Sequence, residues 1–268
     1  MSVESLSIAL PHMRVELGGK KRNLERVRQA AQIAKNMGAH VIVLPSMFNV
    51  GPVNSPHFRV RVGKRSLMES IPGYTSEYLG SIARDIGITI LAGPIYERVG
   101  SKTYRTVFLV EPLRGVTTKL RKLVSKKGAA PLNEAIIDYG LRLGLLVEND
   151  ILLPELSLYL YLLEPHAIIA FPELTPEGTK QRLALFARSL ECETMILAVG
   201  GIVSRGKEDL FELPTFVISE NGEVVEEVRG MAERVIVVKV SAVTKKRAID
   251  GKRLELLKKV RKLIREMK

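Results

Sequence analysis

The chain of 268 residues has a single cysteine, no tryptophan and four histidines. One cysteine, Cys192, excludes an internal disulfide, a cysteine-rich metal cluster and a paired redox motif. The histidines (His12, His40, His57 and His166) lack metal-ligand spacing, and no glycine loop of the phosphate-binding kind is present. We therefore expect no metal ion and no cofactor, and thiol chemistry has one candidate residue.

Long apolar runs are also missing, since none approaches the roughly 20 residues that cross a bilayer. The first residues show no basic and apolar signal pattern. We expect a cytoplasmic protein with no membrane partner. Apolar residues make up 46% of the chain and are spread evenly, which favours one large core. The abundance of charged residues, with a lone cysteine, is typical of thermophile proteins.

Acidic residues are fewer than basic ones, 29 against 41, and the imbalance is concentrated at the end of the chain. Residues 245–268 hold eleven Lys and Arg against three acidic residues. Their apolar residues recur at helical spacing, which predicts a helical tail with a solvated basic face. Nucleic acid is the alternative partner, but the tail has no aromatic residue for base stacking. We rank this function last. The apolar residues are Leu254, Leu257, Val260, Ile264 and Met267.

Strands and helices alternate in the first half of the chain, and the second half repeats this order. Part of the amino-acid sequence is repeated as well. The segment His40-Val-Ile-Val-Leu-Pro45 is similar to His166-Ala-Ile-Ile-Ala-Phe171-Pro172. Such a pattern predicts two mixed sheets packed back to back with helices outside, formed by residues 1–244 and followed by the tail of residues 245–268. The expected strands cover 6–10, 40–45, 89–93, 104–110, 116–123, 142–147, 167–171, 195–200, 215–218, 223–228 and 234–240; the expected helices cover 24–37, 76–86, 154–164 and 177–193.

The helix that starts at Pro154 is apolar almost all round, and one sheet cannot cover such a helix. We expect a second copy of the chain to cover it, which gives a homo-oligomer such as a homodimer. The alternative is deep burial within one chain.

Three segments give the chain a family resemblance. They are Val41-Ile-Val-Leu-Pro45-Ser46, Lys119-Leu-Arg121-Lys122-Leu, and the stretch from Gly144 to Glu155. In order and spacing they resemble the nitrilase, or carbon-nitrogen hydrolase, superfamily. The resemblance implies a four-layer αββα sandwich. It also implies a site in which a Glu acts as base, a Lys stabilises an oxyanion and a Cys attacks an amide or nitrile carbon.

Carried over position by position, the family's Glu falls on Ser46, its Lys on Lys122 and its Cys on Glu148. The family's additional Glu falls in the region of Glu134. The chain therefore resembles a divergent member that lacks the family's Cys and first Glu.

These residue types predict a change in chemistry. A carboxylate is a poor acyl acceptor and a serine is a poor base. We therefore expect a pseudoenzyme, that is, a binding or regulatory subunit without amidase chemistry. Its ligand would be an unidentified small molecule or amide. Lys122 and Glu148 would then form a buried ion pair. In the alternative, a hydrolase, Glu148 activates water and Lys122 acts as electrophile. A dyad of Ser46 and Lys122 is a further option, whereas Cys192 is expected to be a buried structural thiol.

Overall fold

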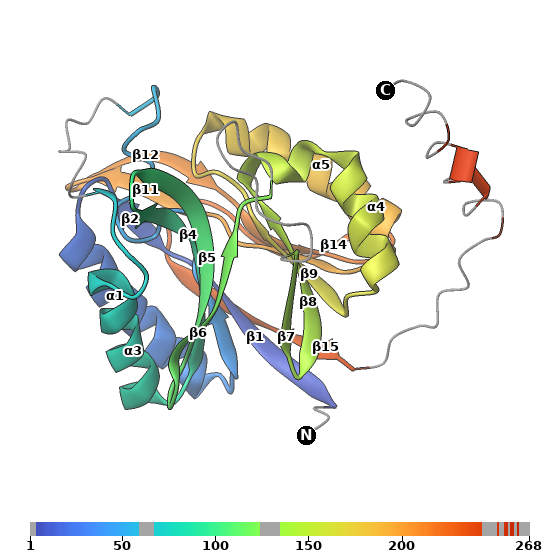
Figure 1. Cartoon of the computed structure of the whole chain (residues 1–268). Coiled ribbons are helices and arrows are strands. Elements are labelled where there is room, and N and C mark those ends of the chain that lie inside the picture. Colours follow the sequence, from blue (N-terminus) through green and yellow to red (C-terminus); the bar gives the residue numbers. More distant parts are fainter. Residues whose placement is uncertain are drawn as a thin grey trace.

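The computed structural model describes residues 4–58, 67–123 and 135–242, together with residues 251, 255, 256, 258, 259 and 262 of the tail. Two six-stranded sheets lie back to back, and helices cover their outer faces (Figure 1). This is the predicted αββα sandwich. The stripe of apolar tail residues lies outside the described residues, so the tail helix and the domain boundary at residue 244 stay predictions.

The first sheet is mixed and has the strand order β15-β1-β3-β4-β5-β6. Helices α1 and α3 pack on its outer face, where apolar residues of α1 at helical spacing meet the sheet. Helix α1 ends before Gly38, which adopts a φ of +80°. The elements are β1 (Ser5–His12), α1 (Lys20–Asn36), β3 (Val41–Val43), α3 (Tyr74–Ile86), β4 (Thr89–Val99), β5 (Lys102–Glu111), β6 (Gly115–Arg121) and β15 (Arg234–Ser241).

The second sheet has the order β14-β13-β10-β9-β8-β7, with α4 and α5 on its outer face. A short 3-10 helix, η2, joins β8 to α4. The elements are β7 (Ile136–Tyr139), β8 (Leu141–Val147), η2 (Glu148–Leu152), α4 (Pro154–Leu163), β9 (Ala167–Phe171), α5 (Pro176–Cys192), β10 (Ile196–Ala198), β13 (Thr215–Ile218) and β14 (Val224–Val228).

The internal repeat is confirmed by strand pairing. From β15 to β6 the pairs run antiparallel, parallel, parallel, antiparallel and antiparallel, and the pairs from β7 to β14 follow the same order. Strand β3 is therefore the counterpart of β9. His40 and His166 confirm the match, because each Nδ1 accepts a backbone N–H, from Ser7 at 3.0 Å and from Arg142 at 3.1 Å.

A third sheet was not predicted. It consists of β2 (Arg14–Glu16), β11 (Gly201–Arg205) and β12 (Glu208–Leu213), with β11 in the middle. Strand β2 has three residues, too few for an alternating pattern to be visible in the sequence. Because β2 follows β1 and β11 follows β10, this small sheet joins the two large ones.

One of the apolar cores lies between the two large sheets. Along β1 and β8, alternate residues point into this layer, as the period of two in a strand requires. Leu6, Ile8 and Leu10 of β1 lie there, together with Leu143 and Leu145 of β8.

Helix α4 is buried on one face only. Leu156 and Leu160 are buried against the second sheet, whereas Leu162 keeps 44% of its surface exposed and Leu152, just before the helix, keeps 42%. Deep burial within one chain is therefore not observed, and a homo-oligomer through this helix stays a prediction. In the described part of the chain, no helix is long and apolar enough to span a bilayer.

Candidate functional site

The three residues that the sequence brings forward lie together at the carboxyl ends of the strands. Ser46 follows β3, Lys122 follows β6 and Glu148 follows β8. The Ser46 hydroxyl donates to Glu148 Oε1 at 3.3 Å, and Lys122 Nζ donates to Glu148 Oε2 at 3.3 Å. The predicted ion pair between Lys122 and Glu148 is confirmed. Both partners donate to Glu148, so a Ser46–Lys122 dyad is not formed.

Glu148 occupies a tight turn at the point where β8 passes into η2. Its φ is +52°, in the left-handed region that non-glycine residues rarely adopt, and its surface is 2% exposed. Backbone strain of this kind costs about 1–3 kcal/mol and persists where the surrounding structure holds it, often at functional sites. The turn directs the Glu148 side chain toward the ends of the neighbouring strands.

Arg105 is a fourth member of the site, which the sequence analysis missed. On β5, its Nε lies 3.4 Å from Glu148 Oε2, and its guanidinium group stacks 3.9 Å over the Tyr96 ring. The backbone N–H of Lys122 donates to the carbonyl oxygen of Arg105 at 2.8 Å, which keeps the two cations side by side. No sequence motif marks this arginine, because its role follows only from the pairing of β5 with β6.

Glu173, which follows β9, is a second residue that the sequence analysis missed. Burial raises the pKa of its carboxyl group, and the negative charge of Glu148 raises it further, while Lys122 and Arg105 act in the opposite direction. The buried Gln181 of α5 holds Glu173, because its Oε1 accepts the Glu173 backbone N–H at 2.7 Å. The internal repeat could have shown this residue, since Pro172-Glu173 follows β9 as Pro45-Ser46 follows β3.

The charges at the site leave an excess of positive charge. Lys122 and Arg105 both contact one buried carboxylate, that of Glu148, which balances only one of their two charges. Such a balance favours an anionic group, or a developing negative charge, next to the two cations.

Other candidates from the sequence lie elsewhere. Glu134 is outside the described residues, so its match to the family's additional Glu stays a prediction. Cys192 is fully buried at the end of α5, where its thiol donates to the carbonyl oxygen of Ser157 at 3.2 Å, as expected for a structural thiol. In the described ranges, no cluster of His, Cys, Asp and Glu has the arrangement of a metal site.

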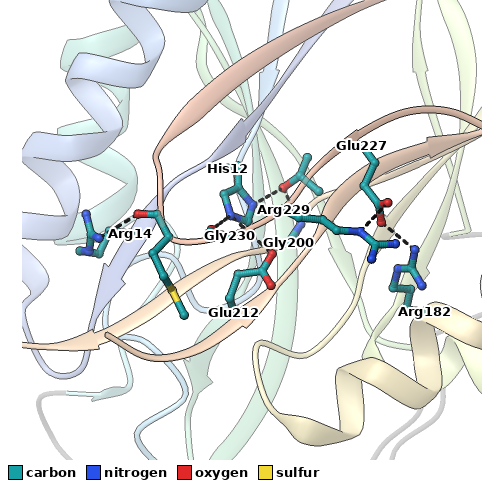
Figure 2. Close-up of polar contacts among 10 residues, drawn as sticks. His12, Arg14, Arg182, Gly200, Glu212, Glu227, Arg229 and Gly230 are labelled. Atoms are coloured by element: carbon teal, nitrogen blue, oxygen red, sulfur yellow. Dashed lines mark hydrogen bonds and ion pairs between the residues drawn. The ribbon is translucent and has the colours of Figure 1, made fainter. Parts of the chain in front are cut away.

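A second buried polar cluster surrounds His12 at the end of β1 (Figure 2). His12 Nε2 lies 2.9 Å from the carbonyl oxygen of Gly230 and 3.7 Å from Glu212 Oε1. This contact with a carbonyl assigns the proton to Nε2, and Nδ1 faces the Thr215 hydroxyl at 3.2 Å. Burial lowers the pKa of His12, while its hydrogen bond to Gly230 and the charge of Glu212 oppose that effect. These contacts give His12 a structural role at the end of β1.

Solved structures of known proteins share this fold. An amidase of the nitrilase superfamily from Nesterenkonia superposes with a TM-score of 0.74 at 19% identity, covering 97% of this chain and 98% of that one. Another structure of that amidase, at 20% identity, covers 95% of this chain and 96% of the other, also with a TM-score of 0.74, and carries a fluoroacetamide-derived adduct on its active site cysteine. At this identity the likeness concerns the fold alone.

Sequence relatives match shorter regions. An omega-amidase from Xenopus tropicalis is 31% identical over 104 residues, which is 39% of this chain and 35% of the relative. A nitrilase from Pyrococcus abyssi is 29% identical over 119 residues, or 44% of this chain and 43% of the relative. The matched regions therefore span less than half the length of these two curated relatives.

The family model described as Carbon-nitrogen hydrolase matches residues 8–248, which include all strands of both large sheets except the first residues of β1. The chain belongs to the carbon-nitrogen hydrolase family.

Proposed function

We propose that the protein hydrolyses a carbon–nitrogen bond of an amide by means of a water molecule that Glu148 activates. The observation that carries the proposal is the buried Glu148 carboxylate, held between Lys122 and Arg105 at the strand ends. Family membership and the amidases among its relatives support hydrolysis over a role without chemistry. In this proposal, Ser46 stands where the family has its first Glu, and Glu148 stands where the family has its Cys.

The reaction assigns one task to each group. Glu148 takes a proton from water, and the water oxygen attacks the carbonyl carbon of the amide. The carbonyl oxygen becomes an oxyanion, which Lys122 and Arg105 stabilise in a site that excludes most solvent. The C–N bond then breaks, and the products are a carboxylic acid and an amine or ammonia. No acyl-enzyme intermediate forms, because water and not the protein attacks.

The test is ammonia release by the full-length protein from glutaramate, succinamate and butyramide. Glu148→Gln keeps the size of the side chain but removes the base, and should lower the rate by about 10²-fold or more. Lys122→Met should cause a loss of about 10²–10³-fold, the size expected when one oxyanion partner is removed. Glu177→Gln is the matched control, since this exposed carboxylate on α5 pairs with His57. Unchanged turnover in Glu148→Gln would contradict the proposal.

The second candidate is a binding or regulatory subunit without the family's chemistry. Two observations favour it. The Glu148 carboxylate already contacts three partners, namely Ser46, Lys122 and Arg105. A carboxylate is also a poor acyl acceptor. For such a subunit, no amide in the panel releases ammonia. Glutarate or glutaramate should still raise the melting temperature, and Lys122→Met should remove that increase.

A further inference from the structure

Glu173 follows a proline at the end of β9, as Ser46 follows a proline after β3; counted from His166 and His40, Glu173 lies one residue further along. Strands β3 and β9 have the same place in the two identical pairing orders, and each is followed by a proline. Ser46 comes after the first proline and Glu173 after the second. The repeat thus places a carboxyl group at one of these two equivalent strand ends and a hydroxyl group at the other.

Glu173 and Glu148 leave neighbouring strands at the same edge of the sheet. Strands β8 and β9 are parallel, and Val147 pairs with Phe171 in the register. Glu148 follows Val147 by one residue and Glu173 follows Phe171 by two. Parallel strands bring the groups at their carboxyl ends to one crevice.

Gln181 connects the two strand ends. Its Nε2 donates to Asn149 Oδ1 at 3.1 Å and reaches Glu173 Oε1 at 3.4 Å, so one amide bridges Glu173 and the residue next to Glu148. Gln181 is fully buried. Glu173 itself is half-buried, so its carboxyl group is held in place and keeps access to solvent.

The two carboxyl groups have opposite environments. Glu148 has two cationic partners within 3.4 Å, whereas burial and the charge of Glu148 raise the pKa of Glu173 in spite of the opposing effect of the same cations and of Gln181. The raised pKa makes Glu173 better suited to carry a proton, and acid and base roles require two carboxyl groups in different surroundings.

We infer that Glu173 is the proton-carrying partner of Glu148 and donates its proton to the leaving nitrogen. This inference rests on the proposed hydrolysis, in which the nitrogen needs a proton as it leaves. Glu148 gains a proton from water, and Glu173 loses one to nitrogen as the C–N bond breaks. The proton on Glu148 then passes to solvent and Glu173 takes one up, which restores the starting state.

The first experiment compares leaving groups. An amide nitrogen needs a proton to leave, whereas p-nitrophenolate leaves without one. Glu173→Gln should therefore lower ammonia release from glutaramate by about 10²-fold and leave hydrolysis of p-nitrophenyl acetate nearly unchanged. Glu148→Gln should lower both rates, and the control Glu177→Gln neither. If Glu173→Gln affects neither substrate, or both equally, the inference is overturned.

The second experiment does not depend on turnover. Infrared spectra across a pH titration follow the protonated carboxyl band, and the band that Glu173→Gln removes belongs to Glu173. This band should titrate above the ordinary range for Glu, and Glu148→Gln should shift its midpoint to lower pH. An ordinary midpoint that does not respond to Glu148→Gln would overturn the inference. A wild type that releases no ammonia but shows the expected titration would instead count against the proposed hydrolysis.

Discussion

The two cations around position 148 have a different role next to a carboxylate than they would have next to a thiol. Next to a thiol, Lys122 and Arg105 would stabilise the reactive thiolate form. Next to Glu148 they balance a permanent charge, and removing either cation would leave a buried carboxylate with less compensation. At this scale the residue type, and not the fold, decides which reactions are open to the site.

Replacing Glu148 with cysteine tests whether this position can serve as a nucleophile. In Glu148→Cys, the two cations should lower the pKa of the new thiol, and fluoroacetamide should alkylate it with loss of fluoride. Mass spectrometry of the intact protein and its peptides should show one adduct, at position 148. Wild type is the control, because its buried Cys192 should stay unmodified. Alkylation of Cys192 alone would argue against a nucleophile position at 148.

His12 should make stability depend on pH. Its pKa is lowered from 6.5, chiefly by burial, so below that pH the unfolded chain binds the proton more readily than the folded chain does. Stability should therefore fall as pH drops below 6.5, by up to about 1.4 kcal/mol per pH unit. Urea unfolding between about pH 7.5 and 5.5 measures this. His12→Gln should show a smaller fall, and an equal fall in both proteins would exclude His12 as the cause.

At the scale of elements, the turn after β8 positions both sides of the site. The buried Asp150 of η2 accepts the backbone N–H of Leu123 at 2.9 Å, which ties the segment carrying Lys122 to the turn carrying Glu148. Two elements far apart in the sequence are thus fixed to each other by one carboxylate.

Removing this carboxylate should loosen the site and lower stability. Asp150→Ala leaves the Leu123 N–H without its acceptor, which should cost about 1–3 kcal/mol of unfolding free energy. Asp150→Asn keeps an acceptor oxygen and should cost less. Urea unfolding measures the stability, and ammonia release reports whether Lys122 is displaced. Equal losses in the two variants would show that the charge, and not the hydrogen bond, is what matters.

The elements were easier to predict than the contacts between them. Apolar strands such as β9 and amphipathic helices such as α1 were predicted, because their pattern of apolar residues is visible in the sequence. Strand β2 is too short for such a pattern to be visible. Ser46, Lys122 and Glu148 were found through family motifs, and the internal repeat could have pointed to Glu173. Arg105 enters the site through the register of β5 with β6, which a single sequence does not display.

At the scale of the whole molecule, the layer between the two sheets holds the repeat together. Leu197 of β10 is fully buried in this layer, whereas Leu183 of α5 is 65% exposed. The two leucines have the same chemistry but differ in what surrounds them, which makes them a matched pair for testing where stability resides.

Truncation of each leucine should give very different costs. Leu197→Ala should lower the free energy of unfolding by about 2–5 kcal/mol, because it removes buried methyl groups and leaves a cavity. Leu183→Ala should change it by less than about 0.5 kcal/mol. Urea denaturation curves compare both with wild type. Similar costs for the two variants would contradict a core placed between the sheets.

The pairing of β1 with β15 has a consequence for biosynthesis. These strands stand at opposite ends of the folded core in sequence and pair along their full lengths. While the chain is still being made, the edge of β1 has no complementary strand until residues 234–241 leave the ribosome, so a nascent chain carries an open β-edge that can associate with other chains. Among the described strands, β15 is the last to be synthesised, and it pairs with the first.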